Sequence, residues 1–530
     1  MMHRIRTPED LTPAVIAGVA RGTITIVLDA ALLARVRANR TAVEAALAGD
    51  QPVYGVNTGM GALAGIRLDA GDQERHQNTL MAGRSVGSAP WLREVEARAL
   101  VAVRLRTLLE PAAGASPDLC RHLAALLDAG VTPAIPARGS GAAGEIIPLA
   151  HAGAALIGIG QMLDGDGNAV DAGPALEAAG LRPYSFSAKE GVAFLEGVPG
   201  LTGLAVLAAD AARTLTAQVT EVVAAEHAVA RASLDPWHPA FGAGDAELRT
   251  IMESLEAARG DGPPGALQAP VSFRVSAPAL AVATRAAAGL EAAVDRALTC
   301  VTDSPAFLGG RFVGSPGFAG TDLVTAAGTL ATALVHLAEL GAARLHRLLD
   351  PHVTGLTRQL SDAPGVHAGM VAVHKRSVGV AHRLRRFAAT ALIGPIETSA
   401  GQEDVQSFTF EAAESLTECL TGLREVLACE ILALHQAHLL TTSRPGTSGA
   451  PPSPGAAPSP AASLSAGAAP SPDDRSSSTV PPASADDTSP PLAPDISDLS
   501  GIWARLPQQA GDRPFGRDLD LIIGMLEAGR

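Results

Sequence analysis

The sequence predicts a mainly α fold built around a bundle of long helices. Apolar residues recur at spacings of three and four over long segments, which is the period of a helix with one buried face. The alternation of apolar and polar residues that marks a half-buried strand is rare. Hydrophobic residues make up 47% of the 530 positions but aromatic residues only 3%, so alanine, leucine and valine must fill the core. Such small side chains favour closely packed helices.

Three segments, 201–223, 325–349 and 411–440, carry this period most clearly. The apolar stripe of the first consists of Leu201, Leu204, Leu207, Leu215, Val219 and Val222. The stripe of the third consists of Leu416, Leu420, Leu423, Leu427, Ile431 and Leu434. The middle segment should end before Pro351, because proline lacks an N–H and its ring obstructs a helix. Each predicted helix is long enough to span a domain, at roughly 1.5 Å per residue.

Composition divides the chain into four parts. Residues 1–200 combine loops with shorter helical stretches, and residues 201–441 contain the long helices. Residues 442–494 are rich in Pro, Ser and Ala and almost lack large apolar side chains. We expect a disordered insertion there, because such a segment cannot bury enough apolar surface to offset the entropy of ordering. Residues 495–530 predict a helical tail.

Charge and residue spacing argue against several classes of protein. The formal net charge of −14 is unfavourable for nucleic-acid binding. No apolar run approaches the ~20 residues of a membrane span, and the N-terminal MMHRIRTPEDLTP has no apolar signal core. The four cysteines are scattered without a CxxC pair, and no spacing of His and Glu resembles a metal site. We therefore expect a cytoplasmic protein with no nucleic-acid partner, no membrane partner and no metal site.

Two glycine-rich segments are the first candidates for chemistry, YGVNTGMG at 54–61 and GSGAAGEIIPLAH at 139–151. On its glycines alone, the first segment is as consistent with a structural turn as with a binding loop. A phosphate-binding loop would need a strand before it, whereas a helix-like segment precedes this one.

Together with five further segments, these motifs resemble, in order, those of the aromatic amino acid ammonia-lyase family, which includes histidine, phenylalanine and tyrosine ammonia-lyases. The matching segments, with the family's form in parentheses, are YGVNTGMG (YGVNTGFG), GAAGEIIPLAH (GASGDLAPLAH), AKEGVAFLEG at 188–197 (AKEGLALLNG), QAPVSFR at 268–274 (QDPYSLR), TDSP at 302–305 (TDNP), AELGAARLHRLLDP and TSAGQED. The resemblance runs from about residue 10 to 440 and includes the tail. It implies a long-helix bundle of the ammonia-lyase, or fumarase/aspartase-like, type. It also implies a small-molecule substrate and a homotetramer whose subunits share active sites.

Lyases of this family remove an amino group and a β-proton from an α-amino acid with the help of an electrophile, methylidene-imidazolone. That group forms from an Ala-Ser-Gly of their own chain. At the corresponding place this sequence has Ala142, Ala143 and Gly144. Alanine has no hydroxyl to lose as water, so we expect no methylidene-imidazolone and no other cofactor. Ser140, flanked by two glycines, is an alternative source only if the loop is shifted in register.

Three other residues depart from the family's pattern. Glu196 stands in place of an asparagine, Val271 in place of a tyrosine and Arg84 in place of a histidine. The resemblance puts these positions where the substrate's amino group and its electrophile would meet. We therefore expect Glu196 and Arg84 to bind substrate.

Several site residues of the family are retained. By resemblance, Tyr54 is the catalytic base, Arg274 holds the substrate carboxylate in its planar fork, and Gln268 is a polar substrate-binding residue. The unperturbed pKa of a phenol is about 10, so it must fall by roughly 3 units for a base that works near pH 7. A cationic substrate and helix N-termini can lower it. A packed tyrosine, a surface ion pair and a structural amide are the corresponding alternatives.

Two further residues bear on the identity of the substrate. Glu403 resembles the glutamate of the histidine branch, where a carboxylate accepts a hydrogen bond from the imidazole N–H; a capping carboxylate is the alternative. Lys375 is expected either to face the substrate ring and stabilise negative charge on it, or to be a solvated lysine.

The replaced and the retained family residues together predict a carbon–nitrogen lyase whose leaving group needs no electrophile. A quaternary ammonium leaves as a neutral tertiary amine, so our hypothesis is the release of trimethylamine from ergothioneine, or a similar histidine betaine, to give a urocanate-like acrylate. The site is similar in this respect to the ergothionase branch of the family. Glu196 would face the cation, and Lys375 the sulfur-bearing ring. The alternatives are a histidine or aromatic amino acid ammonia-lyase with a Ser140-derived electrophile, a non-catalytic tetrameric relative, and a lyase acting on another β-substituted acid.

Overall fold

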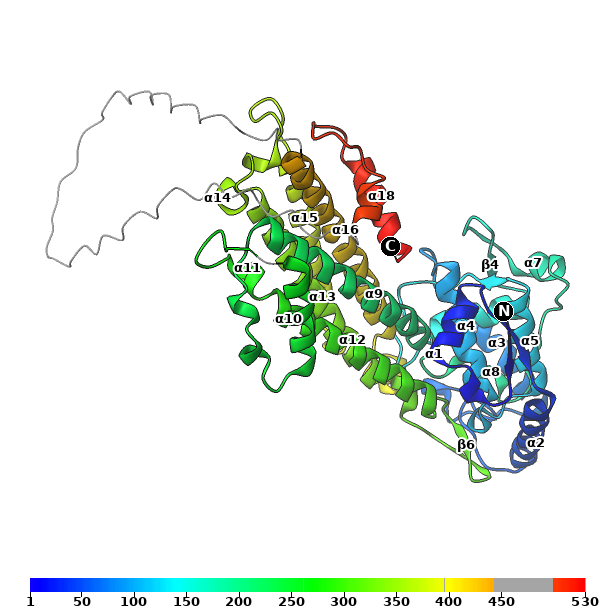
Figure 1. Cartoon of the computed structure of the whole chain (residues 1–530). Helices are drawn as coiled ribbons and strands as arrows, with labels where there is room; N and C mark the ends of the chain where they lie inside the picture. The colour runs from blue at the N-terminus through cyan, green and yellow to red at the C-terminus, as the bar shows by residue number, and fades with distance from the viewer. Residues whose placement is uncertain (261, 395, 443–498, 530) are drawn as a thin grey trace, which may run out of the picture.

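Helices dominate the structure. The computed structural model describes residues 1–260, 262–394, 396–442 and 499–529 (Figure 1). Helices account for 61% of the structure and the strands are short, so the mainly α prediction is confirmed. The insertion predicted at 442–494 lies, apart from Thr442, outside the described residues.

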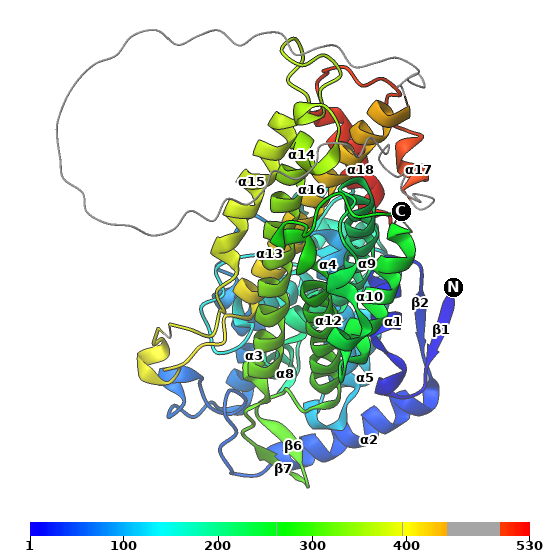
Figure 2. The same cartoon turned by 60° about the vertical axis from the view of Figure 1, so that its left-hand side comes forward.

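Five helices form the central bundle: α9 (Pro199–Val229), α12 (Ser276–Thr299), α13 (Thr321–Leu348), α15 (Val371–Leu384) and α16 (Thr409–Thr442). Helix α16 packs against α9, α13 and α15, and α12 packs against α9 and α13. Figures 1 and 2 show these helices side by side along the long dimension of the molecule. The three segments predicted from the apolar period lie in α9, α13 and α16, and α13 ends just before Pro351.

The N-terminal part gathers at one end of the bundle (Figure 1), where α4 packs against α1, α5 and α9. Its helices are α1 (Pro13–Ala20), α2 (Ala30–Leu47), α3 (Ala70–Arg84), α4 (Glu94–Leu109), α5 (Pro117–Asp128), α6 (Ile146–Leu156), α7 (Ala172–Ala178) and α8 (Glu190–Leu195). Its strands form a parallel pair, β1 (Met2–Ile5) with β2 (Thr25–Leu28), and an antiparallel sheet of β3 (Thr132–Pro133), β4 (Gln161–Leu163) and β5 (Ala169–Asp171).

Shorter elements complete the fold. The segments between the long helices hold α10 (Ala246–Arg259), α11 (Val271–Arg274), α14 (Pro351–Thr354) and an antiparallel hairpin of β6 (Ala306–Leu308) and β7 (Arg311–Val313). The tail holds α17 (Ser500–Trp503) and α18 (Gly516–Glu527), and α18 packs against α16.

Small residues let the helices approach closely. A Cβ added to Gly203 of α9 would lie 2.8 Å from the main-chain carbon of Ala99 in α4. A side chain at position 203 would therefore force the two helices apart. This contact joins the N-terminal part directly to the bundle.

A buried ionic triad ties three helices of the bundle together. Arg344 of α13 donates from Nη2 to Glu430 Oε1 of α16 over 2.7 Å, and from Nε to Glu226 of α9. All three side chains are 1% exposed or less. Burial and the neighbouring Glu430 charge raise the pKa of Glu226 well above its ordinary value. In the triad a single arginine cation therefore faces two buried carboxyl groups, and Glu226 keeps its proton to higher pH than an exposed glutamate does.

Two helical segments, Glu190–Val229 and Gly317–Leu348, are long and apolar enough to cross a membrane by length and composition alone. The expectation that no segment approaches a membrane span is therefore wrong. The most apolar window of the first segment is 94% buried inside the fold, and that of the second is 56% buried. Helix α9 is apolar because much of its length is buried against α4, α12 and α16.

Candidate active site

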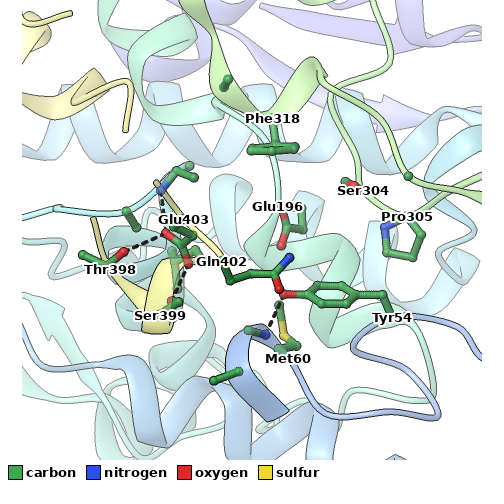
Figure 3. A pocket seen from close by; sticks show the side chains of 18 of the residues that line it. Tyr54, Met60, Glu196, Ser304, Pro305, Phe318, Thr398, Ser399, Gln402 and Glu403 are labelled. Atoms are coloured by element: carbon green, nitrogen blue, oxygen red, sulfur yellow. Dashed lines mark hydrogen bonds between the residues drawn. The ribbon is translucent and has the colours of Figure 1, made fainter. Parts of the chain in front are cut away.

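A large cavity, of about 1040 Å³, lies where several loops meet. Its walls come from the turn at 52–63, the C-terminal end of α3, the loop at 141–144, the residue after α8, and the segments 304–319 and 398–405. Tyr54, Arg84, Glu196, Glu403 and residues 142–144 all line it, so the structure brings together most of the site residues predicted from the sequence. Figure 3 shows Tyr54, Glu196 and Gln402 facing a common space, with Phe318 on the far side of the cavity.

The YGVNTG turn is held by its own polar side chains. Asn57 accepts a hydrogen bond from the N–H of Val53 over 2.7 Å, and the Thr58 hydroxyl accepts one from the N–H of Gly55 over 3.2 Å. Gly55 has φ +69°, and a Cβ there would lie 2.9 Å from Met60 Cγ. Only glycine fits this position. The motif is thus a tight turn that aims the side chain of Tyr54 into the cavity.

The phenolic oxygen of Tyr54 accepts a hydrogen bond from the main-chain N–H of Gly61 over 2.7 Å. Burial raises the pKa of Tyr54, and the charges of Glu196 and Glu403 raise it further, whereas the Gly61 N–H and the Arg84 cation lower it. The net direction is upward. A base that works near pH 7 needs the opposite shift, so the expected lowering of this pKa is not present in the chain alone.

The loop at the family's electrophile position is held by Glu403. The main-chain N–H of Ala143 donates to Glu403 Oε2 over 2.9 Å, and the Ser399 hydroxyl donates to Oε1 over 2.9 Å. Ser399 and Ala400 have φ of 54° and 55°, in the left-handed region that disfavours residues with a Cβ. This strained turn places Glu403 against the loop.

A second carboxyl, Glu145, anchors the other end of this loop. It accepts hydrogen bonds from the N–H groups of Gly200 and Leu201 over 2.5 and 2.7 Å, at the start of α9. Burial raises its pKa to about 7, and these two hydrogen bonds oppose that shift. Sequence reasoning did not select Glu145, although it lies within the GAAGEIIPLAH motif. Ser140 of the same loop is 2% exposed, its hydroxyl has no hydrogen-bond partner among the described residues, and it does not line the cavity.

Glu196 follows α8 and is 8% exposed. Burial raises its pKa to about 8, with the charges of Asp303 and Glu403 adding to the shift and those of Lys189 and Arg104 opposing it. Below about pH 8 the protonated form of Glu196 is therefore favoured. Its carboxyl lines the cavity at the position where the family has a neutral asparagine.

A buried charge cluster lies behind Glu196. Lys189 Nζ is 2.6 Å from Asp303 Oδ2, and both side chains are buried. Arg104 of α4 donates to the carbonyl oxygens of Ala193 and Glu196 over 2.8 and 2.5 Å. These three residues were not predicted. Each of them could have been selected from the sequence. Lys189 and Asp303 lie in the AKEG and TDSP motifs, and Arg104 is a charged residue within an apolar helical stretch.

Arg84 is the last residue of α3, and its Nη2 lies 3.8 Å from Met60 Sδ. Burial lowers its pKa, while Tyr54, Glu196 and Glu403 raise it. Within the part of the chain that the structure describes, it forms no ion pair within 4.0 Å.

Arg274, Gln268 and Lys375 do not reach this cavity. Arg274 and Gln268 line a separate cavity of about 280 Å³ together with Phe241 and Leu267. Nε of Arg274 is buried without a hydrogen-bond partner among the described residues. Lys375 is exposed on α15. No cluster of three or more His, Cys, Asp or Glu side chains in the described ranges is placed to hold a metal ion.

Comparison with known proteins gives consistent matches. A sequence model of the family described as aromatic amino acid lyase matches residues 11–456. The histidine ammonia-lyase of Streptomyces coelicolor is 31% identical over 464 residues, covering 83% of this chain and 88% of the relative. The probable histidine ammonia-lyase of Halobacterium salinarum is 32% identical over 450 residues, covering 80% and 85%.

Solved structures show the same fold. Ergothionase from Treponema denticola, in complex with desmethyl-ergothioneine sulfonic acid, superposes with a TM-score of 0.84 at 20% identity, over 100% of this chain and 99% of that one. Histidine ammonia-lyase from Trypanosoma cruzi superposes with a TM-score of 0.82 at 21% identity, over 100% and 94%. At these identities the superpositions establish the architecture of the chain, an all-α bundle of the ammonia-lyase type.

Proposed function

The chain belongs to the aromatic amino acid lyase family and is an amine-eliminating carbon–nitrogen lyase, and from this premise we propose that its substrate is a betaine of histidine. The reaction would release a tertiary amine and leave a urocanate-like acrylate. Ergothioneine, with trimethylamine as the leaving group, is the substrate that best suits the site. The observation that carries the proposal is Ala143 at the position of the family's serine, in a loop that lines the cavity together with Tyr54, Glu196 and Glu403.

The residues at the electrophile position do not fit methylidene-imidazolone. Ala143 has no hydroxyl to lose. Ser140 offers no substitute, because it is buried and does not line the cavity. The proposed reaction therefore uses no electrophile.

A quaternary ammonium makes such an electrophile unnecessary. Its nitrogen has no lone pair and cannot add to an electrophile, and it departs as a neutral amine. In the proposed step the oxygen of Tyr54 takes the β-proton, the C–H electron pair forms the Cα=Cβ double bond, and the Cα–N bond breaks with its pair staying on nitrogen. Protons and electrons balance without any co-reactant.

Glu196 supports a cationic substrate. A carboxyl that lines the cavity next to a buried cluster is costly to ionise when alone, and a fixed positive charge against it favours ionisation. The charge of that cation would also offset the effect of Glu196 and Glu403 on the Tyr54 pKa. Substrate binding would thus move the base toward its reactive form. Glu403, already fixed by Ala143 and Ser399, has lone pairs left for an imidazole N–H.

The remaining predicted residues fit a site completed by a second subunit. Arg274 and Gln268 line a cavity beside exposed apolar side chains, with Leu267 91% exposed and Phe241 66% exposed. Apolar side chains this exposed are typical of an interface. We propose that a homotetramer carries Arg274, Gln268 and Lys375 into the large cavity of a neighbouring subunit. Arg274 would then hold the substrate carboxylate, and Lys375 the sulfur-bearing ring.

The proposal is tested by incubating the protein with ergothioneine, hercynine and histidine in parallel. We expect a conjugated acrylate in the ultraviolet from the two betaines, with one trimethylamine released per acrylate. Tyr54→Phe is the control, because it removes only the phenolic oxygen. Ammonia and urocanate from histidine, with no product from either betaine, would contradict the proposal and favour an ordinary ammonia-lyase.

A further inference from the structure

Arg84 is the one cationic side chain among the described residues that line the large cavity, and the proposed reaction gives it no role. Its guanidinium contacts Met60, with Nη2 3.8 Å from Sδ. Met60 directly precedes Gly61, whose N–H donates to the phenolic oxygen of Tyr54 over 2.7 Å. The cation is therefore fixed against the same turn that holds the oxygen of the proposed base.

The guanidinium of Arg84 has no direct ion-pair partner among the described residues. Glu196, Glu403 and Asp404 share the cavity with it, yet in the described part of the chain no carboxylate oxygen lies within 4.0 Å of its guanidinium. A partly buried arginine without an ion-pair partner is unfavourable unless an anion forms nearby during function. The anion that the proposed reaction requires on this turn is the phenolate of Tyr54.

We propose that Arg84 is a positioning residue that stabilises the phenolate of Tyr54 and so sets the basicity of the catalytic oxygen. This inference rests on the proposed role of Tyr54 as the base. Arg84 and the Gly61 N–H lower the pKa of Tyr54. Burial and the carboxylates of Glu196 and Glu403 raise it. Because a guanidinium stays protonated throughout the working range of pH, its contribution does not change as the other groups titrate.

The composition of the chain makes the inference directly measurable. The sequence has only two tyrosines, and the second, Tyr184, is hydrogen-bonded to Glu190 over 2.9 Å and has a pKa raised by burial and by that carboxylate. The near-ultraviolet absorbance of phenolate can therefore be assigned. The wild-type titration minus that of Tyr54→Phe gives the pKa of Tyr54 in the substrate-free protein, with circular dichroism marking the pH range over which the fold persists.

We expect Arg84→Gln to raise the pKa of Tyr54 measurably, because the variant removes a positive charge that lowers this pKa. Arg84→Lys is the matched control, because it keeps the charge and should shift the titration much less. Arg84→Met, which is apolar and of similar length, replaces Arg84→Gln if the amide variant does not fold. A titration that moves by less than about 0.3 units in the neutral variants would overturn the inference.

A kinetic readout extends the test. The base must be deprotonated to act, so kcat/KM rises with pH up to the pKa of the base in the free enzyme. In Arg84→Gln this rise should move to higher pH by the same amount as the phenolate titration, whereas a purely structural role would lower the rate equally at every pH. Failure of betaine turnover in the wild type would contradict the proposed function and leave the titration result standing. An unmoved titration in an active enzyme would contradict this inference alone.

Discussion

The amide nitrogen of Ala143 lies 2.9 Å from Oε2 of Glu403, 260 positions further along the chain, so this carboxylate holds the loop at 141–144. The hydroxyl of Ser399 holds the other oxygen of the same carboxylate. Glu403 is thus an anchor of the loop as well as the proposed partner of the substrate ring.

The purified protein should have the mass of its unmodified chain. The reason is that Ala143 cannot lose water and its N–H is engaged by Glu403. Intact-mass measurement followed by mapping of the peptide that contains residues 139–144 checks this. A deficit of about two waters within that peptide, the signature of cyclisation and dehydration, would show that the electrophile forms after all.

Replacement of Tyr54 by Phe should abolish elimination while substrate still binds. The change removes the phenolic oxygen that accepts the Gly61 N–H and leaves the ring in place. Stopped assays for kcat and calorimetry with ergothioneine measure the two effects separately. If turnover stays within about tenfold of the wild type, roughly 1.4 kcal/mol, the base is a different group.

Binding of a betaine should be coupled to loss of a proton from Glu196. The pKa of Glu196 is raised to about 8, so below that pH the carboxyl carries a proton that a fixed cation must displace. The affinity for the betaine should therefore be highest above about pH 8. It should fall as the pH decreases, by up to about tenfold per pH unit. Calorimetry on the Tyr54→Phe variant measures this without turnover and without titration of the phenol.

The matched control for that experiment is Glu196→Gln in the same background. The amide keeps the shape of the carboxyl but cannot ionise, so binding of hercynine should weaken by about 1–3 kcal/mol above pH 8 and lose its dependence on pH. If the affinity of the Tyr54→Phe parent is already independent of pH between about pH 6 and pH 9, Glu196 does not face the cation.

The buried triad predicts an effect on stability. The pKa of Glu226 is raised in the folded protein, so the folded state binds this proton more tightly than the unfolded chain does. The stability from this group is fully present below its ordinary pKa and is lost as pH rises toward the folded value. Glu226→Gln, which still offers Arg344 an acceptor, should therefore raise the free energy of unfolding at neutral pH and more so at alkaline pH.

Urea unfolding of the wild type and Glu226→Gln at several pH values measures this difference. The double replacement of Glu226 and Glu430 by Gln is the control, because it leaves Arg344 without an anion and should destabilise strongly, by about 3–5 kcal/mol. Destabilisation by Glu226→Gln alone, at every pH, would mean that Glu226 is ionised in the fold.

The architecture was predictable because its signal is local. The apolar period of three and four residues located α9, α13 and α16, and Pro351 located the end of α13. Residues carried by contiguous motifs, such as Tyr54, were also found. The contacts that shape the site were not, because they join distant positions: Lys189 meets Asp303 across 114 residues.

Two kinds of information lay beyond the single sequence. The upward shift of the Tyr54 pKa comes from burial and from carboxylates that only the fold brings near it. Arg274 lies at a separate cavity in this chain, which its motif alone could not indicate because the motif does not place the arginine in space.

The most direct test of the central claim is the ratio of kcat/KM for hercynine to that for histidine, which differ only in the three N-methyl groups. We predict that the wild type prefers hercynine, that Glu196→Gln reduces this preference by about 10- to 100-fold, corresponding to about 1–3 kcal/mol, and that Glu403→Gln slows both substrates alike. A wild type that prefers histidine, with a ratio that Glu196→Gln leaves unchanged, would contradict the account.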